Sequence, residues 1–384
     1  MRLRARAVLL VPPLLAAAAV SAATAHAGSA APTWQASTLD LPLAWQVTSG
    51  RPTAVVAVVD SGVQADHPAL QGRVLPGHDF VNGDTDASDD NGHGTAIAGI
   101  VASVCPDCRI LPVKVLDANR TGDWATIAAG VRWAADSGAE VINLSVGAPR
   151  APDVVGDAVA YALSKGVIVV AAAGNDGVDE SFYPARYPGV VSVAGVDENG
   201  VRSSWSNFGS GVTVAAPGCA TAPWLRGGYE QDFCGTSTAA PFVAGLAGLA
   251  RAYEPTLTPS AFAAALTAST TPVADPSTAA FGVPDANRLL LALGAPSAAP
   301  TESAPPTVTA AGRRLVARVG SWHGAASYRI EWQRSAGGTW TDVTAGSAYT
   351  PGRADAGRRL RVLVTAANVR GSTTAASASV RVAR

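Results

Sequence analysis

Short runs of Val, Ile and Ala recur along the chain up to about residue 293, and longer segments with helical spacing of apolar residues separate them. Runs that are apolar at every position predict strands buried on both faces, and alternation with helices favours a mostly parallel sheet between helical layers. The predicted strands are residues 55–59, 110–115, 141–144, 167–171, 190–193 and 212–215. The predicted helices are residues 93–104, 124–136, 153–165 and 237–253.

The pattern changes after residue 294. Residues 295–306 are rich in Pro, Ala and Ser, which is typical of an extended linker. Residues 307–384 then show short runs in which apolar and polar residues alternate, and this predicts a small all-β sandwich. Its clearest predicted strands are residues 314–319, 327–333, 359–366 and 376–382.

The first 27 residues are typical of a secretory signal. They combine three arginines, an apolar run over residues 7–20 and a small-x-small site that ends at Ala27. A transmembrane anchor is the alternative, but the run is short and contains two consecutive prolines. We therefore expect residues 1–27 to be removed, the protein to be secreted without a membrane anchor, and residues 28–294 to form one α/β domain.

Charge divides the chain at the same place. Residues 28–300 carry 13 basic and 25 acidic side chains, whereas residues 301–384 carry 12 basic and 4 acidic ones. The basic segment could bind an anionic cell-wall polymer, or its charge could serve solubility alone. We expect no nucleic-acid partner, because an exported chain without interleaved aromatic residues lacks the usual platform. We expect a monomer.

Four cysteines in an exported chain indicate disulfides, and four allow three pairings. The favoured pairing joins Cys105 to Cys108 as a staple of a surface loop between a helix and a strand, although a redox dithiol is the alternative. It joins Cys219 to Cys234 across a Pro- and Gly-containing excursion, which would pin the chain next to residues 235–237.

Three motifs carry candidate chemistry. Ser237 follows Gly235-Thr236 and leads into an apolar run, which predicts a nucleophile at the first turn of a buried helix. Asp60 ends a predicted strand, and His93 stands between glycines at the start of a predicted helix. Each residue alone could be structural: a tightly packed helix start, a cap acid or a helix-start histidine. Together they supply a nucleophile, a base and an acid.

In the chain order Asp, His, Ser, these motifs resemble the subtilisin-like serine peptidases, or subtilases. The resemblance implies a subtilisin-like three-layer α/β fold with a mostly parallel sheet. It also implies a serine endopeptidase that hydrolyses peptide bonds, with Ser237 as nucleophile, His93 as base and Asp60 as its partner. Asn175 matches the family's oxyanion-hole asparagine, to act with the N–H of Ser237, although a left-handed turn residue is the other interpretation.

The resemblance also implies substrate contacts. The walls of the primary pocket would be Ser145, Val146, Gly147 and Ala172, Ala173, Gly174. Thr121 and Gly122 would form a second edge for an extended peptide, unless they belong to an ordinary surface loop. Phe182 stands where small residues often form the pocket floor, so we expect a shallow pocket that takes small or medium side chains before the scissile bond.

No cofactor is expected to be required, and no metal site is assigned. The acidic loop Asp79–Asp90 could bind calcium weakly, although a solvated loop is the favoured interpretation. Ala96-Ile97 and Thr238 stand where the family usually has His-Val and Met.

Two alternatives to a general endopeptidase are left open, and the departures at Ala96-Ile97 and Thr238 bear only on the second. One is a restricted processing peptidase like the mycosins, and the other is a catalytically silent surface-binding protein. Finally, Ser321-Trp322 and the segment 328–332 resemble bacterial immunoglobulin-like repeats, so the C-terminal sandwich is expected to be immunoglobulin-like.

Overall fold

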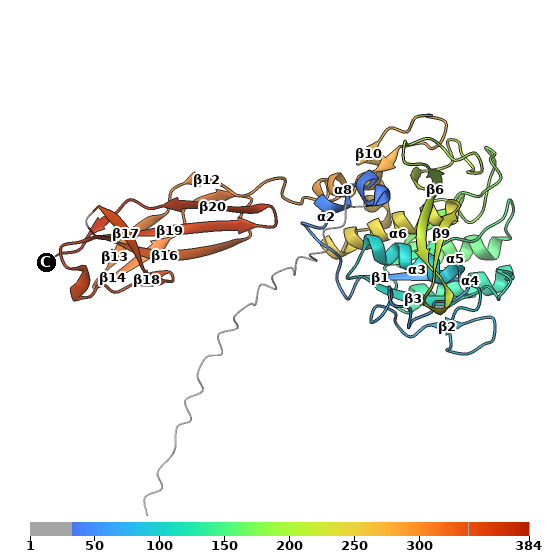
Figure 1. The fold of residues 1–384 in the computed structure, drawn as a ribbon, viewed down its shortest axis with the longest axis horizontal. Helices are drawn as coiled ribbons and strands as arrows, with labels where there is room; N and C mark the ends of the chain where they lie inside the picture. Colours follow the sequence, from blue (N-terminus) through green and yellow to red (C-terminus); the bar gives the residue numbers. More distant parts are fainter. Residues whose placement is uncertain (1–32, 337, 384) are drawn as a thin grey trace, which may run out of the picture. The chain divides into compact units, whose positions relative to one another are not determined.

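The computed structural model describes residues 33–336 and 338–383, and the predicted signal at residues 1–27 lies outside them. A seven-stranded sheet in the order β2-β3-β1-β4-β5-β6-β7 forms the centre of the first part of the chain (Figure 1). Every neighbouring pair in it is parallel, as predicted. The strands are β1 (Val55–Asp60), β2 (His78–Asp79), β3 (Arg109–Lys114), β4 (Val141–Leu144), β5 (Ile168–Ala172), β6 (Val191–Val196) and β7 (Val214–Pro217).

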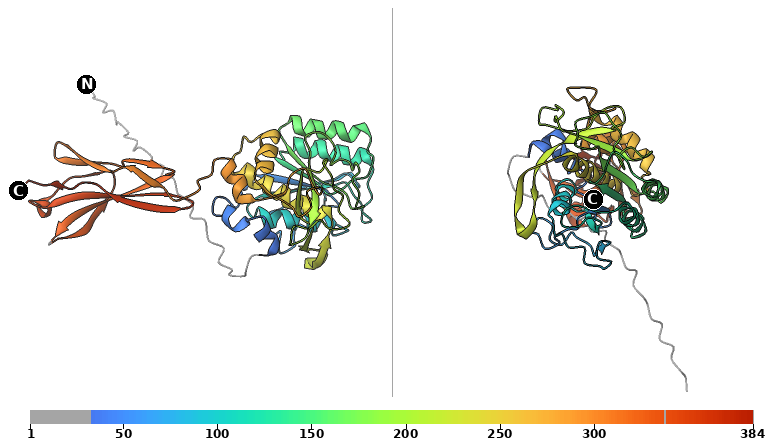
Figure 2. Two further views of the ribbon diagram at one scale, coloured as in Figure 1. Left: turned by 90° about the horizontal axis from the view of Figure 1, so that it is seen from above. Right: turned by 90° about the vertical axis from the view of Figure 1, so that its right-hand side faces the viewer.

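Helices cover both faces of this sheet (Figure 2). Side chains of β1 alternate between two hydrophobic cores, because successive residues of a strand point to opposite faces. Val56 and Val58 pack in the core shared with α3 and α6, and Ala57 and Val59 pack in the core shared with α4 and α5. The helices are α1 (Trp34–Thr38), α2 (Leu41–Ala44), α3 (His93–Val104), α4 (Trp124–Asp136), α5 (Asp153–Ser164), α6 (Thr236–Tyr253), α7 (Pro259–Ala268) and α8 (Ala286–Ala292).

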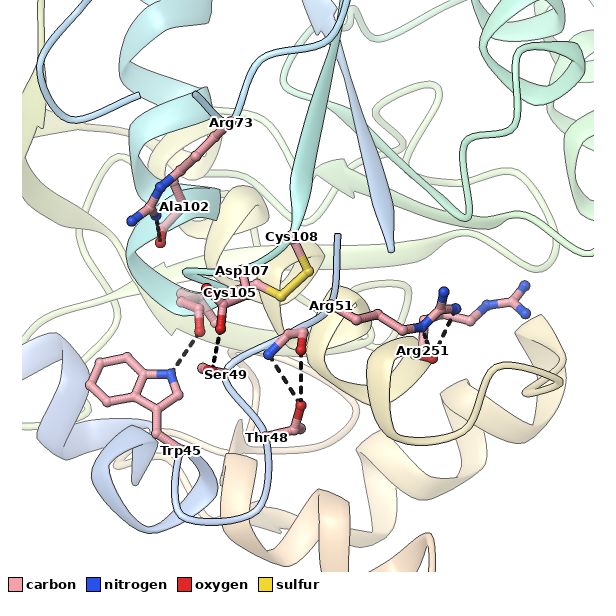
Figure 3. Close-up of a disulfide and its surroundings, with 12 residues drawn as sticks. Trp45, Thr48, Ser49, Arg51, Arg73, Ala102, Cys105, Asp107, Cys108 and Arg251 are labelled. Atoms are coloured by element: carbon pink, nitrogen blue, oxygen red, sulfur yellow. Dashed lines mark hydrogen bonds between the residues drawn. A yellow bond between two sulfur atoms is a disulfide. The ribbon is translucent and has the colours of Figure 1, made fainter. Parts of the chain in front are cut away.

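Both expected disulfides are present, Cys105–Cys108 and Cys219–Cys234. The first joins the end of α3 to the start of β3, and Figure 3 shows it beside the segment that leads into β1. The N–H of Asp107 donates to the carbonyl of Ser49 at 2.9 Å. Both cysteines are buried and the tip of the loop between them is exposed, so the predicted staple of this surface loop also packs in the core.

Two small antiparallel pairs complete the α/β part. The hairpin of β8 (Cys219–Pro223) and β9 (Tyr229–Cys234) turns through η1 (Leu225–Gly227), and β10 (Thr270–Thr271) pairs with β11 (Val283–Pro284). Cys219 and Cys234 face each other across the hairpin, directly before α6.

The C-terminal part is an antiparallel all-β module. One sheet has the order β13-β14-β18 and another β17-β16-β19-β20, with β21 added to β19 and a separate pair β12-β15. Trp332 is fully buried between the sheets with Ala317, Val362 and Val364, and its indole N–H donates to the carbonyl of Gly346 at 2.9 Å. The strands are β12 (Thr301–Ala304), β13 (Thr307–Ala311), β14 (Arg314–Arg318), β15 (Ser321–His323), β16 (Ser327–Ala336), β17 (Thr339–Ala345), β18 (Ala348–Tyr349), β19 (Arg359–Asn368), β20 (Gly371–Ala376) and β21 (Val380–Arg381), with η2 (Arg353–Asp355) before β19.

Two details of the module differ from the prediction. The segment 376–382, predicted as one strand, holds only the last residue of β20 and the two residues of β21. Between them, the N–H of Ser377 donates to the carbonyl of Val362, and the Ser377 hydroxyl oxygen accepts the N–H of Val362. The second detail lies within the predicted linker, where β12 pairs with β15. The immunoglobulin-like assignment of the module stays a prediction.

No helix in the described part of the chain is both long enough and apolar enough to cross a bilayer.

The close contact between α3 and α6 depends on Gly245. A Cβ atom at this position would lie 2.5 Å from Cβ of Val104, nearer than real Cβ atoms approach. We expect Gly245→Ala to lower the free energy of unfolding by about 1–3 kcal/mol through overpacking, outweighing the gain of about 1 kcal/mol in helix propensity. Urea unfolding measures this. As a control, Gly245→Ala combined with Val104→Gly, which removes the clashing Cβ, should be more stable than the sum of the single effects predicts; simple additivity would contradict the packing argument.

Candidate active site

The structure brings the four candidate catalytic residues to the edge of the sheet where the parallel strands end. Asp60 is the last residue of β1, and His93 is the first residue of α3. Ser237 is the second residue of α6, and Asn175 follows three positions after β5. Open α/β sheets bind their ligands outside the carboxyl ends of their strands.

Asp60 orients the His93 ring through a hydrogen bond to its Nδ1. Nδ1 of His93 lies 2.7 Å from Oδ1 of Asp60, and both side chains are buried. The same carboxylate oxygen accepts the N–H of Ser61 at 2.7 Å. Because a carboxylate only accepts, Nδ1 is the protonated nitrogen, and Nε2 is left to act as a base. The Phe233 ring packs edge-on against the imidazole at 5.5 Å between centroids.

The turn before His93 is fixed by two charged side chains. Asp89 accepts hydrogen bonds from the N–H groups of Gly92 and Thr95, both at 2.9 Å. Lys114 is buried at the end of β3, and its Nζ donates to the carbonyl oxygens of Ser61 and Leu116 and pairs with Asp90 at 2.7 Å. The charges at these strand ends are therefore partnered, and the base is held on a rigid turn.

Thr236 sets the orientation of the Asn175 amide. Oδ1 of Asn175 accepts both the N–H of Thr236 at 2.8 Å and its hydroxyl at 2.9 Å. The Thr236 hydroxyl oxygen accepts the N–H of Gly174 at 3.1 Å. With Oδ1 occupied twice, the two donors on Nδ2 are left to face the cleft, as stabilisation of an oxyanion requires.

Gly235 leaves open the space around which these groups converge. A Cβ atom there would lie 3.0 Å from Oγ of Ser237, 3.5 Å from Nδ2 of Asn175 and 3.7 Å from the backbone nitrogen of Ser237. Its φ of 150° is also one that residues with side chains rarely adopt. The N–H of Gly235 donates to Gly218 at 2.9 Å, beside the Cys219–Cys234 bridge, so the disulfide does pin this turn.

A proline explains how the carbonyl of Ser237 is satisfied. Residue 241, four positions on, would normally donate its N–H to this carbonyl, but Pro241 has none. The hydroxyl of Ser145 donates to it instead at 3.0 Å, and Asn143 in turn donates to that hydroxyl at 2.9 Å. The sequence predicted Ser145 only as a pocket wall. Pro241, four residues after Ser237, was the signal in the sequence that could have predicted the hydrogen bond from Ser145.

A cleft of about 540 Å³ opens beside these groups and is lined by His93, Asn175 and Ser237. Ala173, predicted as a pocket wall, does not line it, because this residue is buried in the hydrophobic core. The other predicted substrate-binding residues do line it: Thr121, Gly122, Ser145, Val146, Gly147, Ala172 and Gly174. Lining residues that the sequence did not indicate are Leu116, Asn119, Trp124, Ile127 and Ala148.

Phe182 fills the space between the two pocket walls. A Cβ atom at Gly147 would lie 2.4 Å from Cε1 of Phe182, and one at Gly174 would lie 2.8 Å from its Cγ. Both glycines are therefore needed to admit the ring. Two backbone hydrogen bonds between Ala148 and Tyr183, at 2.8 and 3.0 Å, hold the segment that carries it.

The carboxylates of the acidic loop Asp79–Asp90 accept hydrogen bonds from groups within the loop and next to it. Asp79 is buried and accepts N–H groups of Val81 and Asn82, and Asp86 accepts the N–H and hydroxyl of Ser88. The Ser88 hydroxyl lowers the pKa of Asp86. Across residues 33–336 and 338–383, no group of three or more His, Cys, Asp or Glu side chains gathers as a metal would require. Calcium binding at this loop stays a prediction.

Relatives with known structures or names share the α/β part. A thermophilic serine proteinase from Bacillus sp. (strain AK1) is 45% identical over 216 residues, which are 54% of this chain and 54% of that protein. Thermitase from Thermoactinomyces vulgaris is 44% identical over 225 residues, 55% of this chain and 79% of that protein. A solved protease structure from Pseudoalteromonas arctica has a TM-score of 0.61 and 31% identity, covering 66% of this chain and 94% of that one.

The chain spans about half of the length of the first of these relatives. Residues 51–288 match the family model described as the subtilase family, peptidase S8. This range is more than half of the chain and contains all four residues that converge on the cleft. The chain belongs to the subtilase family.

Proposed function

We propose that this chain is a secreted serine endopeptidase that hydrolyses peptide bonds through an acyl-enzyme. The observation that carries the proposal is the convergence around Gly235 of a hydroxyl, a backbone N–H and an oriented amide, beside a histidine whose Nδ1 is held by a buried aspartate. Two disulfides support a route through an oxidising compartment.

In this mechanism Oγ of Ser237 attacks the substrate carbonyl carbon while Nε2 of His93 takes its proton. Asp60 stabilises the imidazolium that forms. The carbonyl oxygen becomes negative and receives hydrogen bonds from Nδ2 of Asn175 and the N–H of Ser237, with the positive end of the 18-residue α6 behind them. His93 then protonates the leaving amine, and a water molecule repeats the sequence to release the acid.

The substrate is proposed to bind as an extended strand between the edge at Ser145–Gly147 and the loop at Thr121–Gly122. Both edges line the cleft, and main-chain hydrogen bonds to them would hold any sequence. Preference then comes from the pocket that Phe182 narrows. A general endopeptidase is favoured over a silent binding protein, because the hydroxyl, the imidazole and the amide that the reaction needs all line one cleft.

Binding of an anionic cell-wall polymer stays a prediction. Four exposed arginines gather where β19 begins, and this is where such a polymer would dock: Arg353, Arg358, Arg359 and Arg381. Sedimentation of the chain with insoluble wall material would decide it.

Labelling with a fluorophosphonate tests the nucleophile. The mature chain should be labelled at Ser237 and should digest casein. Ser237→Ala should lose both activities, because the hydroxyls of Ser145 and Thr236, which also line the cleft, are engaged by the carbonyl of Ser237 and by Asn175. Labelling without casein digestion would favour a restricted processing peptidase. A correctly folded chain that does not label would refute the proposal.

Thr236→Val tests the orientation of the oxyanion amide. The change keeps the shape of the side chain but removes the hydroxyl that donates to Asn175. We expect kcat to fall about tenfold, the value of one lost hydrogen bond, with KM nearly constant. Removing a whole oxyanion donor lowers kcat by a factor of about 10²–10³, a magnitude that was measured on a protein of this family. Thr238→Val is the matched control, since that hydroxyl donates to the carbonyl of Phe233; an equal fall in kcat there would contradict the argument.

Phe182→Ala tests the shallow pocket. The wild-type chain should cleave after Ala far better than after Phe, and the variant should raise kcat/KM for Phe by about tenfold or more, because the space freed between Gly147 and Gly174 admits a ring. Peptide substrates that differ only at this position give the measurement. Phe281→Ala, an exposed ring outside the cleft, should change nothing. Efficient wild-type cleavage after Phe or Tyr would disprove the pocket hypothesis.

A further inference from the structure

Arg120 is the one Lys, Arg, Asp or Glu side chain among the residues that line the cleft. It is exposed, and none of the ion pairs formed between described residues includes it. The surrounding part of the chain is acidic, with 25 acidic against 13 basic side chains over residues 28–300. A lone cation on the cleft rim is therefore a local exception to the charge of the domain.

The backbone at Arg120 is held in an unfavourable conformation. Its φ is 59°, in the left-handed region that side-chain-bearing residues usually avoid. A tight turn enforces this conformation: the N–H of Arg120 donates to the carbonyl of Asp117, and the N–H of Asp117 donates to Thr121, both at 2.9 Å. Strain of this kind persists where the surrounding structure fixes it, and it concentrates at functional sites.

The turn is also rigid relative to the catalytic base. The amide of Asn91, two residues before His93, donates to the carbonyl of Ala118 at 2.8 Å. At the other end of the turn, Asp123 caps α4 by accepting the N–H of Thr126 at 2.8 Å. The start of the Arg120 side chain is thus fixed at the rim, while its guanidinium is left in solvent.

The two carboxylates nearest to Arg120 in the sequence, Asp117 and Asp123, are engaged by backbone groups. Asp117 accepts the N–H groups of Thr121 and Asn119, and these bonds lower its pKa. Asp123 likewise has a lowered pKa, through the N–H of Thr126. Both stay ionised, yet neither forms an ion pair with Arg120, so the guanidinium is available to a carboxylate that enters the cleft.

We propose that Arg120 is a specificity-determining residue that favours substrates with an Asp or Glu side chain in the segment lying between the two cleft edges. The inference rests on the proposed function and narrows its substrate class to acidic peptides. A carboxylate there would gain a charge-assisted hydrogen bond to a planar donor, whereas a lysine would meet a like charge.

Internally quenched peptides test the proposal. They share one Ala-rich sequence, and each of the four residues before the scissile bond is set in turn to Glu, Gln or Lys. At one position kcat/KM for Glu should exceed that for Lys by about fivefold at low salt, the size expected of an exposed ion pair, and the ratio should fall towards one in about 1 M NaCl.

Two variants separate charge from shape. Arg120→Asn removes the charge with a residue that tolerates the left-handed region, and it should bring the Glu-to-Lys ratio to about one. Arg150→Gln removes an exposed arginine that does not line the cleft, and it should leave the ratio unchanged. No preference for Glu in the wild type, or a preference that survives Arg120→Asn, overturns the proposal.

Failure of the proposed function would look different, because the chain would then neither hydrolyse any peptide nor label with fluorophosphonate. Binding decides the question in that case. Fluorescence anisotropy with the Ser237→Ala chain should show tighter binding of the Glu peptide than of the Lys peptide, with the difference lost when Arg120→Asn is added. Equal binding of the two peptides overturns the role of Arg120.

Discussion

Burial of both faces of the parallel sheet is the constraint on which the site depends. The strands are largely apolar on both sides because helices cover both, and the buried charged residues of the sheet, Asp60, Asp79 and Lys114, each stand at the last position of a strand. A charged group can be buried there only with partners. Asp60 has the N–H of Ser61 and the imidazole of His93, and Lys114 has two carbonyls and Asp90. The fold thus collects ionised groups at one edge and keeps them rigid.

The sheet could be predicted because short apolar runs in the sequence mark its strands. Short continuous runs rich in β-branched residues favour a strand buried on both faces, whereas longer apolar runs rich in Ala and Gly favour buried helices, and all six runs predicted as strands lie in the sheet. The motifs around Asp60, His93 and Ser237 could be placed for the same reason, since each adjoins such a run or a helix. Both disulfide pairings were also predicted correctly, because each joins cysteines that are near in sequence.

What the sequence could not show are contacts that depend on which distant segments meet. β9 is polar and mostly exposed, so no pattern marked it as a strand. Thr236 next to Ser237 gives no sign that it holds an amide 61 residues away. In the C-terminal module, composition predicted a linker where Thr301–Ala304 instead pairs with β15, because backbone hydrogen bonding at an edge places little demand on side chains.

Helix α6 joins the site to the stability of the whole domain. Fifteen of its 18 residues are buried, and it packs against the sheet and against α3. The backbone amides of α6 should therefore exchange with solvent only when the domain unfolds as a unit. The first turn of α6, which holds Ser237, belongs to the same protected helix. We therefore expect the segment that carries the nucleophile not to unfold locally while the rest of the domain stays folded. In a denaturant titration, the active fraction would follow the cooperative unfolding of the domain, and not a separate earlier loosening of the site.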